Sequence, residues 1–197
     1  MTTLVKVCGM TDASAVDAAI AANVDAIGFV FFAKSPRNVT PGEAKALASS
    51  IPTHIRRVAV MLHPDVSLWQ EVQEAFVPDV LQTDRDDFSY LSVPDEIEQW
   101  PVLREGSVDS ETHLPPMFVY EGRKSGHGQT VDWQQAAAIA RRGKMILAGG
   151  LSIENVADAI AEVRPFGVDV SSAVESSPGK KDVAKIAAFT AAARRSA

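Results

Sequence analysis

Residues 145–174 read Met-Ile-Leu-Ala-Gly-Gly-Leu-Ser-Ile-Glu-Asn-Val-Ala-Asp-Ala-Ile-Ala-Glu-Val-Arg-Pro-Phe-Gly-Val-Asp-Val-Ser-Ser-Ala-Val. The apolar run 145–148 predicts a strand that ends at two glycines, and the run 167–170 predicts a second strand that ends at two serines. Between these strands, apolar residues at three- and four-residue spacing predict a helix over 153–162. A strand, a helix and a second strand in this order are typical of a βαβ unit, which builds a parallel sheet.

The same alternation of strand and helix runs through the whole chain. Short runs rich in β-branched or aromatic residues predict eight strands, at 5–7, 26–32, 57–62, 80–83, 102–104, 117–120, 145–148 and 167–170. Longer, alanine-rich segments predict six helices, at 13–22, 41–50, 67–76, 133–141, 153–162 and 182–194. The segments 86–99 and 106–116 carry prolines and little periodicity, so we expect short or irregular helices there.

Eight strand and helix units predict an α/β protein with a compact (β/α)8 TIM barrel, a single domain over residues 1–197. An open doubly wound sheet is the less favoured alternative, because the first turn, Cys8-Gly9-Met10-Thr11, lacks the three glycines of a dinucleotide-binding loop. Thr40 precedes a proline and a glutamate in the order of a capped helix start, and Ser152 precedes the helix at 153–162 in the same manner.

Composition and charge exclude several classes of partner. The net charge is −6 and the basic residues are scattered along the chain, so we expect no nucleic-acid partner. A single cysteine cannot form an intramolecular disulfide, and no apolar run approaches the length of a membrane span. Residues 1–3 lead straight into a short strand pattern, without the basic region and apolar h-region of a signal peptide. We therefore expect a cytoplasmic monomer with no membrane partner and a small-molecule substrate.

Cys8 is the only cysteine and ends the first predicted strand. In α/β barrels and sheets, the carboxyl ends of the strands are where the chemistry is located. A thiol at this place can act as a base or a nucleophile when its surroundings move its pKa towards neutrality. The alternative for a lone cysteine is a small, buried hydrophobic residue.

The ends of the seventh and eighth predicted strands carry an anion-binding pattern. Gly149 and Gly150 follow the seventh strand, and Ser171 and Ser172 follow the eighth. Backbone N–H groups of a glycine turn can point at a phosphate, and serine hydroxyls add further donors. Because these two loops form the usual phosphate site of such barrels, we expect a phosphate here. A simple tight turn is the alternative for two glycines alone.

Two more strand ends carry candidate residues. Arg37 follows the second strand and a stiffening proline, so its guanidinium can pair with a substrate carboxylate or stack on a ring. Glu121 ends the sixth strand, where partial desolvation can raise the pKa of a carboxyl and make it a general acid. A solvated loop arginine and an exposed glutamate are the alternatives. The three glycines between 122 and 128 predict a mobile loop that can close over a ligand.

No metal site is predicted. The four histidines, His54, His63, His113 and His127, form no helix-spaced pair with carboxylates, and one cysteine cannot build a cysteine-based site. Neither a serine nucleophile elbow nor a Walker loop is present.

In this order, the motifs resemble those of the phosphoribosylanthranilate isomerase family of tryptophan biosynthesis, from one end of the chain to the other. Residues 6–11, Lys-Val-Cys-Gly-Met-Thr, are similar to the opening Lys-Ile-Cys-Gly-Leu-Thr of the family. The similarity continues at 28–31 with 35–37, at 147–151, and at 169–175 with 179–182. The chain departs from the family pattern at Glu121, where the family has aspartate, at 80–84, which replace Val-Gln-Leu-His-Gly, and at Ala173, where glycine is common.

The resemblance implies an isomerase that converts N-(5'-phosphoribosyl)anthranilate to 1-(2-carboxyphenylamino)-1-deoxyribulose 5-phosphate. This Amadori rearrangement needs two proton-transfer groups and no cofactor. Carried over to this chain, Cys8 is the base that removes the C2' proton, and Glu121 is the acid that protonates the furanose ring oxygen.

The resemblance also implies the substrate contacts. Arg37 holds the carboxylate of the anthranilate or stacks near its ring, and Asp169 accepts hydrogen bonds from ribose hydroxyls, although it can equally be a structural turn carboxylate. The phosphate is bound by Gly149, Gly150, Ser171 and Ser172.

Three rival functions differ from this expectation. The sister sugar isomerase of histidine biosynthesis would show a second glycine turn for phosphate in the first half of the chain and a carboxylate in place of Cys8, and this sequence has neither. A bifunctional isomerase is disfavoured for the same reasons. The third rival is a barrel that binds a phosphorylated ligand but does not turn it over. Glu121 in place of the family's aspartate is the feature that would indicate it.

Overall fold

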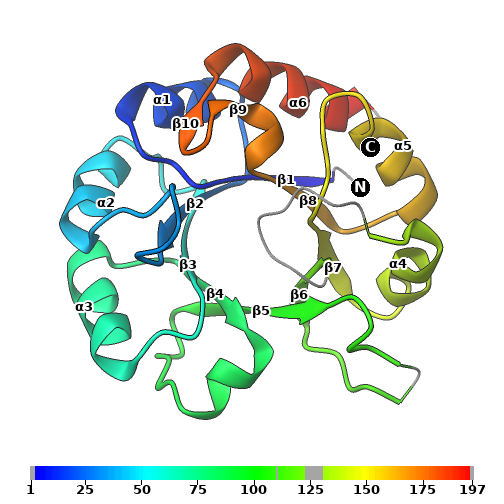
Figure 1. The fold of residues 1–197 in the computed structure, drawn as a ribbon, viewed down its shortest axis with the longest axis horizontal. Helices are drawn as coiled ribbons and strands as arrows, with labels where there is room; N and C mark the ends of the chain where they lie inside the picture. The colour runs from blue at the N-terminus through cyan, green and yellow to red at the C-terminus, as the bar shows by residue number, and fades with distance from the viewer. Residues whose placement is uncertain (1–2, 110, 123–130, 196–197) are drawn as a thin grey trace.

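Eight parallel strands form a closed barrel in the order β1 to β8, which confirms the predicted TIM barrel. The computed structural model describes residues 3–109, 111–122 and 131–195. Figure 1 looks along the barrel, with the strands as an inner ring. The strands are β1 (Leu4–Cys8), β2 (Ala26–Phe31), β3 (Arg56–Met61), β4 (Val80–Asp84), β5 (Glu98–Arg104), β6 (Met117–Glu121), β7 (Lys144–Leu147) and β8 (Gly167–Val170).

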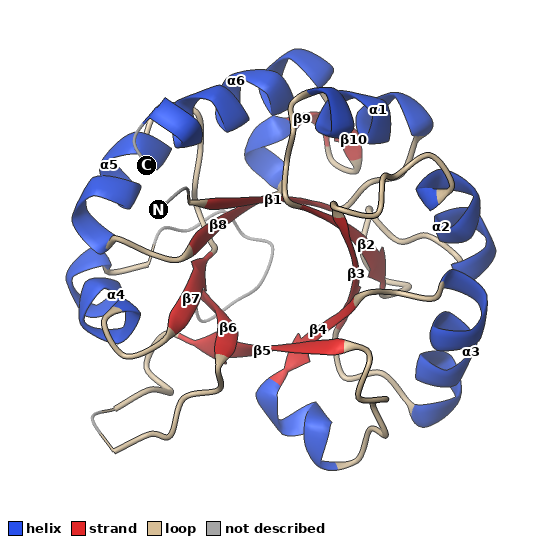
Figure 2. Ribbon diagram, turned by 180° about the vertical axis from the view of Figure 1, so that it is seen from behind, coloured by secondary structure: helices blue, strands red, loops and turns tan. Residues whose placement is uncertain are grey.

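The helices lie outside the ring of strands, as Figure 2 shows from the opposite side. All six predicted helices are present, as α1 (Ala13–Ala21), α2 (Pro41–Ala48), α3 (Val66–Phe76), α4 (Trp133–Ala140), α5 (Val156–Val163) and α6 (Val183–Arg195). A short 3-10 helix (Arg85–Ser89) follows β4, as expected, whereas no helix follows β5 within the described residues, where a short or irregular one was expected. None of the described helices is long and apolar enough to cross a membrane.

Two element boundaries differ from the prediction by three or more residues. Helix α5 begins at Val156 and not at 153, and Ser152 does not cap it. The Asn155 side chain instead accepts the Ser152 N–H at 2.8 Å and donates to the Gly150 carbonyl at 2.9 Å, so these residues belong to the glycine turn. Strand β5 begins at Glu98, four residues before the predicted start, because its polar first residues and Pro101 hide the strand pattern.

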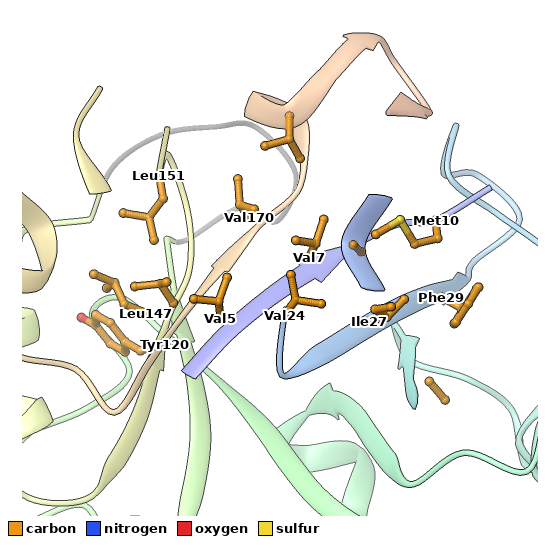
Figure 3. Packing of buried hydrophobic residues seen from close by; sticks show 14 of the residues in the cluster. Val5, Val7, Met10, Val24, Ile27, Phe29, Tyr120, Leu147, Leu151 and Val170 are labelled. Carbon is orange, nitrogen blue, oxygen red and sulfur yellow. The ribbon is translucent and has the colours of Figure 1, made fainter. Parts of the chain in front are cut away.

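The apolar core has two layers, one between the strands and the helices and one inside the barrel. The larger layer lies between strands and helices, and Figure 3 shows Val5 and Val7 on one side of β1 within it. The smaller layer fills the barrel interior with one or two residues from most strands: Ala26, Val58, Val80, Trp100, Val102, Val119, Ile146 and Ala148. The interior is therefore a packed core, and the ligand cavity lies at its end.

Strand alternation decides which side chains reach this cavity. On β1, Val5 and Val7 join the outer layer, so Lys6 and Cys8 point to the barrel interior. On β8, Val168 and Val170 likewise leave Asp169 on the inner side. The inner positions near the carboxyl ends of these strands are polar, which places ionisable groups above the apolar interior layer.

Candidate active site

A cavity of about 470 Å³ opens at the carboxyl ends of the strands. It brings together five of the eight residues predicted for the site, from elements that are far apart in sequence: Cys8, Arg37, Glu121, Asp169 and Ser171. The other ionisable and amide side chains of its lining are Lys34, Gln82, Asp84 and Arg104. Gly149, Gly150 and Ser172 do not line this cavity.

Cys8 is 7% exposed, and Gly28 on the neighbouring strand makes room for its sulfur. A Cβ atom at Gly28 would lie 2.9 Å from Sγ, so a larger residue there would displace the thiol. Burial raises the pKa of Cys8, and the Asp169 carboxylate adds to this effect. The positive charges of Lys6 and Lys181 and a hydrogen bond from Lys6 act in the opposite direction. The thiolate therefore depends on two lysines.

Lys6 is fully buried and lies between the thiol and Asp169. Its Nζ is 2.9 Å from Asp169 Oδ1. Burial alone would lower the pKa of Lys6, but Asp169 and Cys8 outweigh this cost and raise the pKa, so Lys6 keeps its charge. Burial also raises the pKa of Asp169, and Lys6 opposes that rise. Asp169 thus has a buried ion-pair partner, and it also lines the cavity.

Arg37 is held in place by Glu175, the first residue of the hairpin that strands β9 (Glu175–Ser177) and β10 (Lys180–Lys181) form. Its Nε and Nη2 donate to the two carboxylate oxygens at 2.6 and 2.9 Å. Lys181 Nζ donates to the same carboxylate at 2.9 Å. Burial opposes the charge on Glu175, but the hydrogen bonds from Arg37 and Lys181 lower its pKa. The guanidinium plane of Arg37 is therefore fixed before a ligand arrives.

Two glycines allow the loops around Arg37 to approach one another. Gly9, after β1, has a φ of 82°, and a Cβ atom there would lie 2.6 Å from the Arg37 side chain. Gly179 in the hairpin has the same φ, and its Cβ position would lie 2.2 Å from the Pro36 carbonyl oxygen. The hairpin, the β1 loop and the β2 loop therefore pack as one wall of the site.

The serine and glycine turns lie side by side, because β7 and β8 are paired strands. Gly149 and Gly150 have φ values of 91° and 65°, so both need the left-handed region that favours glycine. The Ser171 hydroxyl donates to the Cys8 carbonyl at 3.0 Å, and Lys181 Nζ donates to the Ser171 carbonyl at the same distance. Ser171 thus connects the turn after β8 to the strand that holds the thiol.

Glu121 forms an ion pair with Arg104, which also binds Asp84. The three side chains come from the neighbouring strands β6, β5 and β4 and form one wall of the cavity. Asp84 is in turn 3.4 Å from His63 Nε2, and His63 Nδ1 lies 2.9 Å from Asp87. The hydrogen bond to Asp87 raises the pKa of His63.

Sequence reasoning missed several charged residues that shape the site. Lys6 could have been found, because alternation along β1 puts it on the same side as Cys8. Glu175 and Lys181 stand in the closing motif that the resemblance quotes, but no role was drawn from it. Arg104 and Asp84 give no local signal, since each is a charged residue at a strand end whose partners are distant in sequence.

Part of the prediction lies outside the described residues. The glycine-containing loop predicted to close over a ligand falls largely in 123–130, together with His127. Within the ranges that the structure describes, no group of three or more His, Cys, Asp or Glu side chains could hold a metal ion.

A (β/α)8 barrel with a thiol, carboxylates and fixed cations at its strand ends is typical of a barrel enzyme, and this cavity is its candidate active site. The family model for N-(5'phosphoribosyl)anthranilate (PRA) isomerase matches residues 5–192. The chain belongs to the PRA isomerase family.

Relatives and solved structures agree with this assignment. The N-(5'-phosphoribosyl)anthranilate isomerase of Dechloromonas aromatica is 39% identical over 210 residues, covering 99% of this chain and 98% of the relative. The crystal structure of TrpF from Jonesia denitrificans is 38% identical, with a TM-score of 0.80 over 99% of this chain and 98% of that one. A phosphoribosyl anthranilate isomerase in complex with reduced 1-(o-carboxyphenylamino)-1-deoxyribulose 5-phosphate is 27% identical, with a TM-score of 0.81 over 98% of this chain and 100% of that one.

Proposed function

We propose that this protein performs the isomerisation of its family, from N-(5'-phosphoribosyl)anthranilate to 1-(2-carboxyphenylamino)-1-deoxyribulose 5-phosphate, with Cys8 as base and Glu121 as acid. The observation that carries this proposal is that the two side chains line one cavity although they stand on strands β1 and β6. A proton donor and a proton acceptor that face one ligand are what an acid/base isomerisation requires.

The steps follow from these two groups. The Glu121 carboxyl gives its proton to the furanose ring oxygen, the bond from C1' to that oxygen breaks, and the nitrogen lone pair forms a C1'=N Schiff base. The Cys8 thiolate then takes the proton from C2', which gives an enolamine. The enolamine gains a proton at C1' and loses one from the C2' hydroxyl, so the product is the 2'-ketone. Transfer of one proton from the Cys8 thiol to the Glu121 carboxylate through solvent restores both groups, and no atom is gained or lost.

The remaining predicted residues are proposed as ligands of the substrate. Arg37 would bind the anthranilate carboxylate; its Nη1 is the guanidinium nitrogen without a hydrogen bond to the described residues, since Glu175 holds the other two. Asp169 would accept from ribose hydroxyls. The phosphate would lie at the paired turns after β7 and β8, against Gly149, Gly150, Ser171 and Ser172.

A fluorescence assay of turnover with N-(5'-phosphoribosyl)anthranilate tests the proposal. Because each proton-transfer group contributes about 10²–10⁴-fold to such reactions, we expect Cys8→Ala and Glu121→Gln each to lower kcat by about that factor. Glu121→Asp keeps the acid and should retain part of the activity. Glu162→Gln makes the same chemical change on the exposed face of α5 and serves as the matched control.

Binding of the reduced product separates catalysis from ligand binding. Cys8→Ala should bind the reduced product within about threefold of wild type, because the thiol is proposed to move a proton and not to hold the ligand. Wild-type protein that binds this compound but does not turn over the substrate would establish a non-catalytic binding barrel. Near-normal kcat in Glu121→Gln would remove Glu121 from the mechanism. A cytoplasmic location, a monomeric state and the lack of a nucleic-acid partner stay predictions from the sequence.

A further inference from the structure

A row of alternating charges crosses the wall that β4, β5 and β6 form. Arg104 donates from Nη2 to Asp84 Oδ1 and from Nη1 to Glu121 Oε1. The three side chains are 22%, 18% and 16% exposed, in that order, so water screens their interactions only in part. Of these three residues, the proposed mechanism uses only Glu121.

The barrel geometry, and not a flexible loop, sets the position of Arg104. In β5, Trp100 and Val102 point into the barrel, so Arg104 takes the next inward position at the end of the strand. Arg104 and Glu121 are direct partners in the register of β5 with β6. Both side chains line the cavity together with Cys8.

We propose that Arg104 is the positioning residue of Glu121, and that Asp84 sets how much of the Arg104 charge Glu121 receives. This inference rests on the proposed function, in which Glu121 is the acid. A glutamate has one more rotatable bond than an aspartate, so its carboxyl needs an external contact to stay in one place. The planar guanidinium supplies that contact, and Asp84 holds the guanidinium from its other side.

Arg104 must be shared between Asp84 and Glu121 for this arrangement to work. A guanidinium paired with Glu121 alone would hold that residue as a carboxylate, which cannot donate a proton. The Asp84 carboxylate competes with Glu121 for the Arg104 guanidinium. His63, with Nε2 at 3.4 Å from Asp84 Oδ2, competes with Arg104 for Asp84. His63 is 64% exposed, so its influence is screened by water. The other ionisable groups that line the cavity are Cys8, Lys34, Arg37 and Asp169.

Substitutions of Arg104 and of Asp84 should shift the titration midpoint of Glu121 in opposite directions. The test uses ¹³C NMR to follow the Glu121 carboxyl against pH in the full-length Cys8→Ala protein, alone and with a second substitution. Arg104→Met removes a positive charge, so the titration midpoint of Glu121 should rise by at least about half a pH unit. Asp84→Asn removes a competing carboxylate, so the midpoint should fall. Damage to the fold would not produce two opposite shifts.

Kinetics of the otherwise wild-type protein test the positioning role. Arg104→Met should lower kcat by about 10²-fold, because a misplaced acid misses the ring oxygen, while affinity for the reduced product stays within about threefold. Arg104→Lys keeps the charge and should recover about tenfold of that loss. Arg57→Met is the matched control, since it removes another arginine paired with an aspartate, at 2.8 Å, at the amino end of β3. It should lower Tm and leave kcat within about twofold.

Three results would overturn the inference. They are shifts of the Glu121 midpoint with the same sign in both variants, no shift in either, and a loss of product affinity with unchanged kcat, which would make Arg104 a ligand of the substrate. If wild-type protein shows no turnover, the proposed function fails. The NMR titration then decides the coupling of Arg104 to Glu121 by itself.

Discussion

The Cys8 thiol stands in surroundings that oppose its use as a base. Burial raises its pKa, and only Lys6 and Lys181 favour the thiolate. Both lysines owe their place to carboxylates, Lys6 to Asp169 and Lys181 to Glu175. The charge that favours the thiolate therefore comes from two lysines that do not touch the substrate in the proposed mechanism.

We expect the reaction of Cys8 with iodoacetamide to be slow at pH 7 and to increase as pH rises past 9, because the pKa of the thiol is raised above its ordinary value of 9.0. Lys181→Met removes a charge that favours the thiolate, so it should move the midpoint of the rate against pH to a higher value. The measurement is the alkylation rate between pH 6 and pH 11, followed by mass spectrometry.

Lys144→Met is the control for that experiment. Lys144 begins β7 at the amino end of the barrel and is exposed, so its loss should leave the midpoint unchanged. An alkylation midpoint below pH 8 in wild-type protein would contradict the effect of burial on the thiol.

At the scale of elements, the turn after β7, where we propose that the phosphate binds, has a shape that depends on glycine. Gly149 and Gly150 are both in the left-handed region, and Asn155 links the two ends of the turn through Ser152 N–H and the Gly150 carbonyl. The late start of α5 follows from this use of Asn155. These hydrogen bonds restrict the turn, which would lower the entropic cost of binding the proposed phosphate there.

Gly149→Ala should weaken the binding of the reduced product and destabilise the fold by about 1–2 kcal/mol, because alanine is strained at a φ of 91°. Gly42→Ala is the matched control: Gly42 lies in the first turn of α2 with no atom within 4 Å of its Cβ position, so this change should stabilise the protein by up to about 1 kcal/mol. Calorimetric titration and urea unfolding of both variants provide the comparison. Equal affinities for the reduced product would show that the shape of the turn is not needed.

At the scale of the whole molecule, ion pairs tie loops and strands together around the ring. Asp79 pairs with Arg57 between β3 and β4, Asp87 lies against His63, and Glu175 joins Arg37 to the hairpin. Burial opposes the charge on each carboxylate, but hydrogen bonds from these partners outweigh it and lower the three pKa values.

A lowered pKa makes the stability of the fold depend on pH with a definite sign. Each carboxylate contributes stability above its ordinary pKa, which is 3.8 for aspartate and 4.5 for glutamate, and that contribution is lost as pH falls through the lowered value. We expect the free energy of unfolding in urea to rise slightly as pH falls from 8 to 6, because the pKa of His63 is raised, and to fall steadily below about pH 4.5 as the carboxylates are protonated. A free energy that rises as pH falls below about 4.5 would contradict the linkage of these carboxylates.

Much of the fold could be predicted from the sequence, and the errors have local causes. The strands and helices follow from periodicity, which is a property of neighbouring residues. The start of β5 was misplaced because Pro101 removes a backbone donor and interrupts the strand pattern. The start of α5 was misplaced because Ser152 has the composition of a cap, while Asn155 forms the bonds that close the turn.

The sequence by itself determined the order of strands and helices, and with it which residues stand at the carboxyl ends of the strands, because these depend on local spacing. Only the tertiary structure decided their partners. Lys6 meets Asp169 across 163 positions of sequence, and Arg37 meets Glu175 across 138. Closure of the ring brings these groups together, and burial then fixes their charge states. Neither effect has a local signal, because each depends on the register of all eight strands.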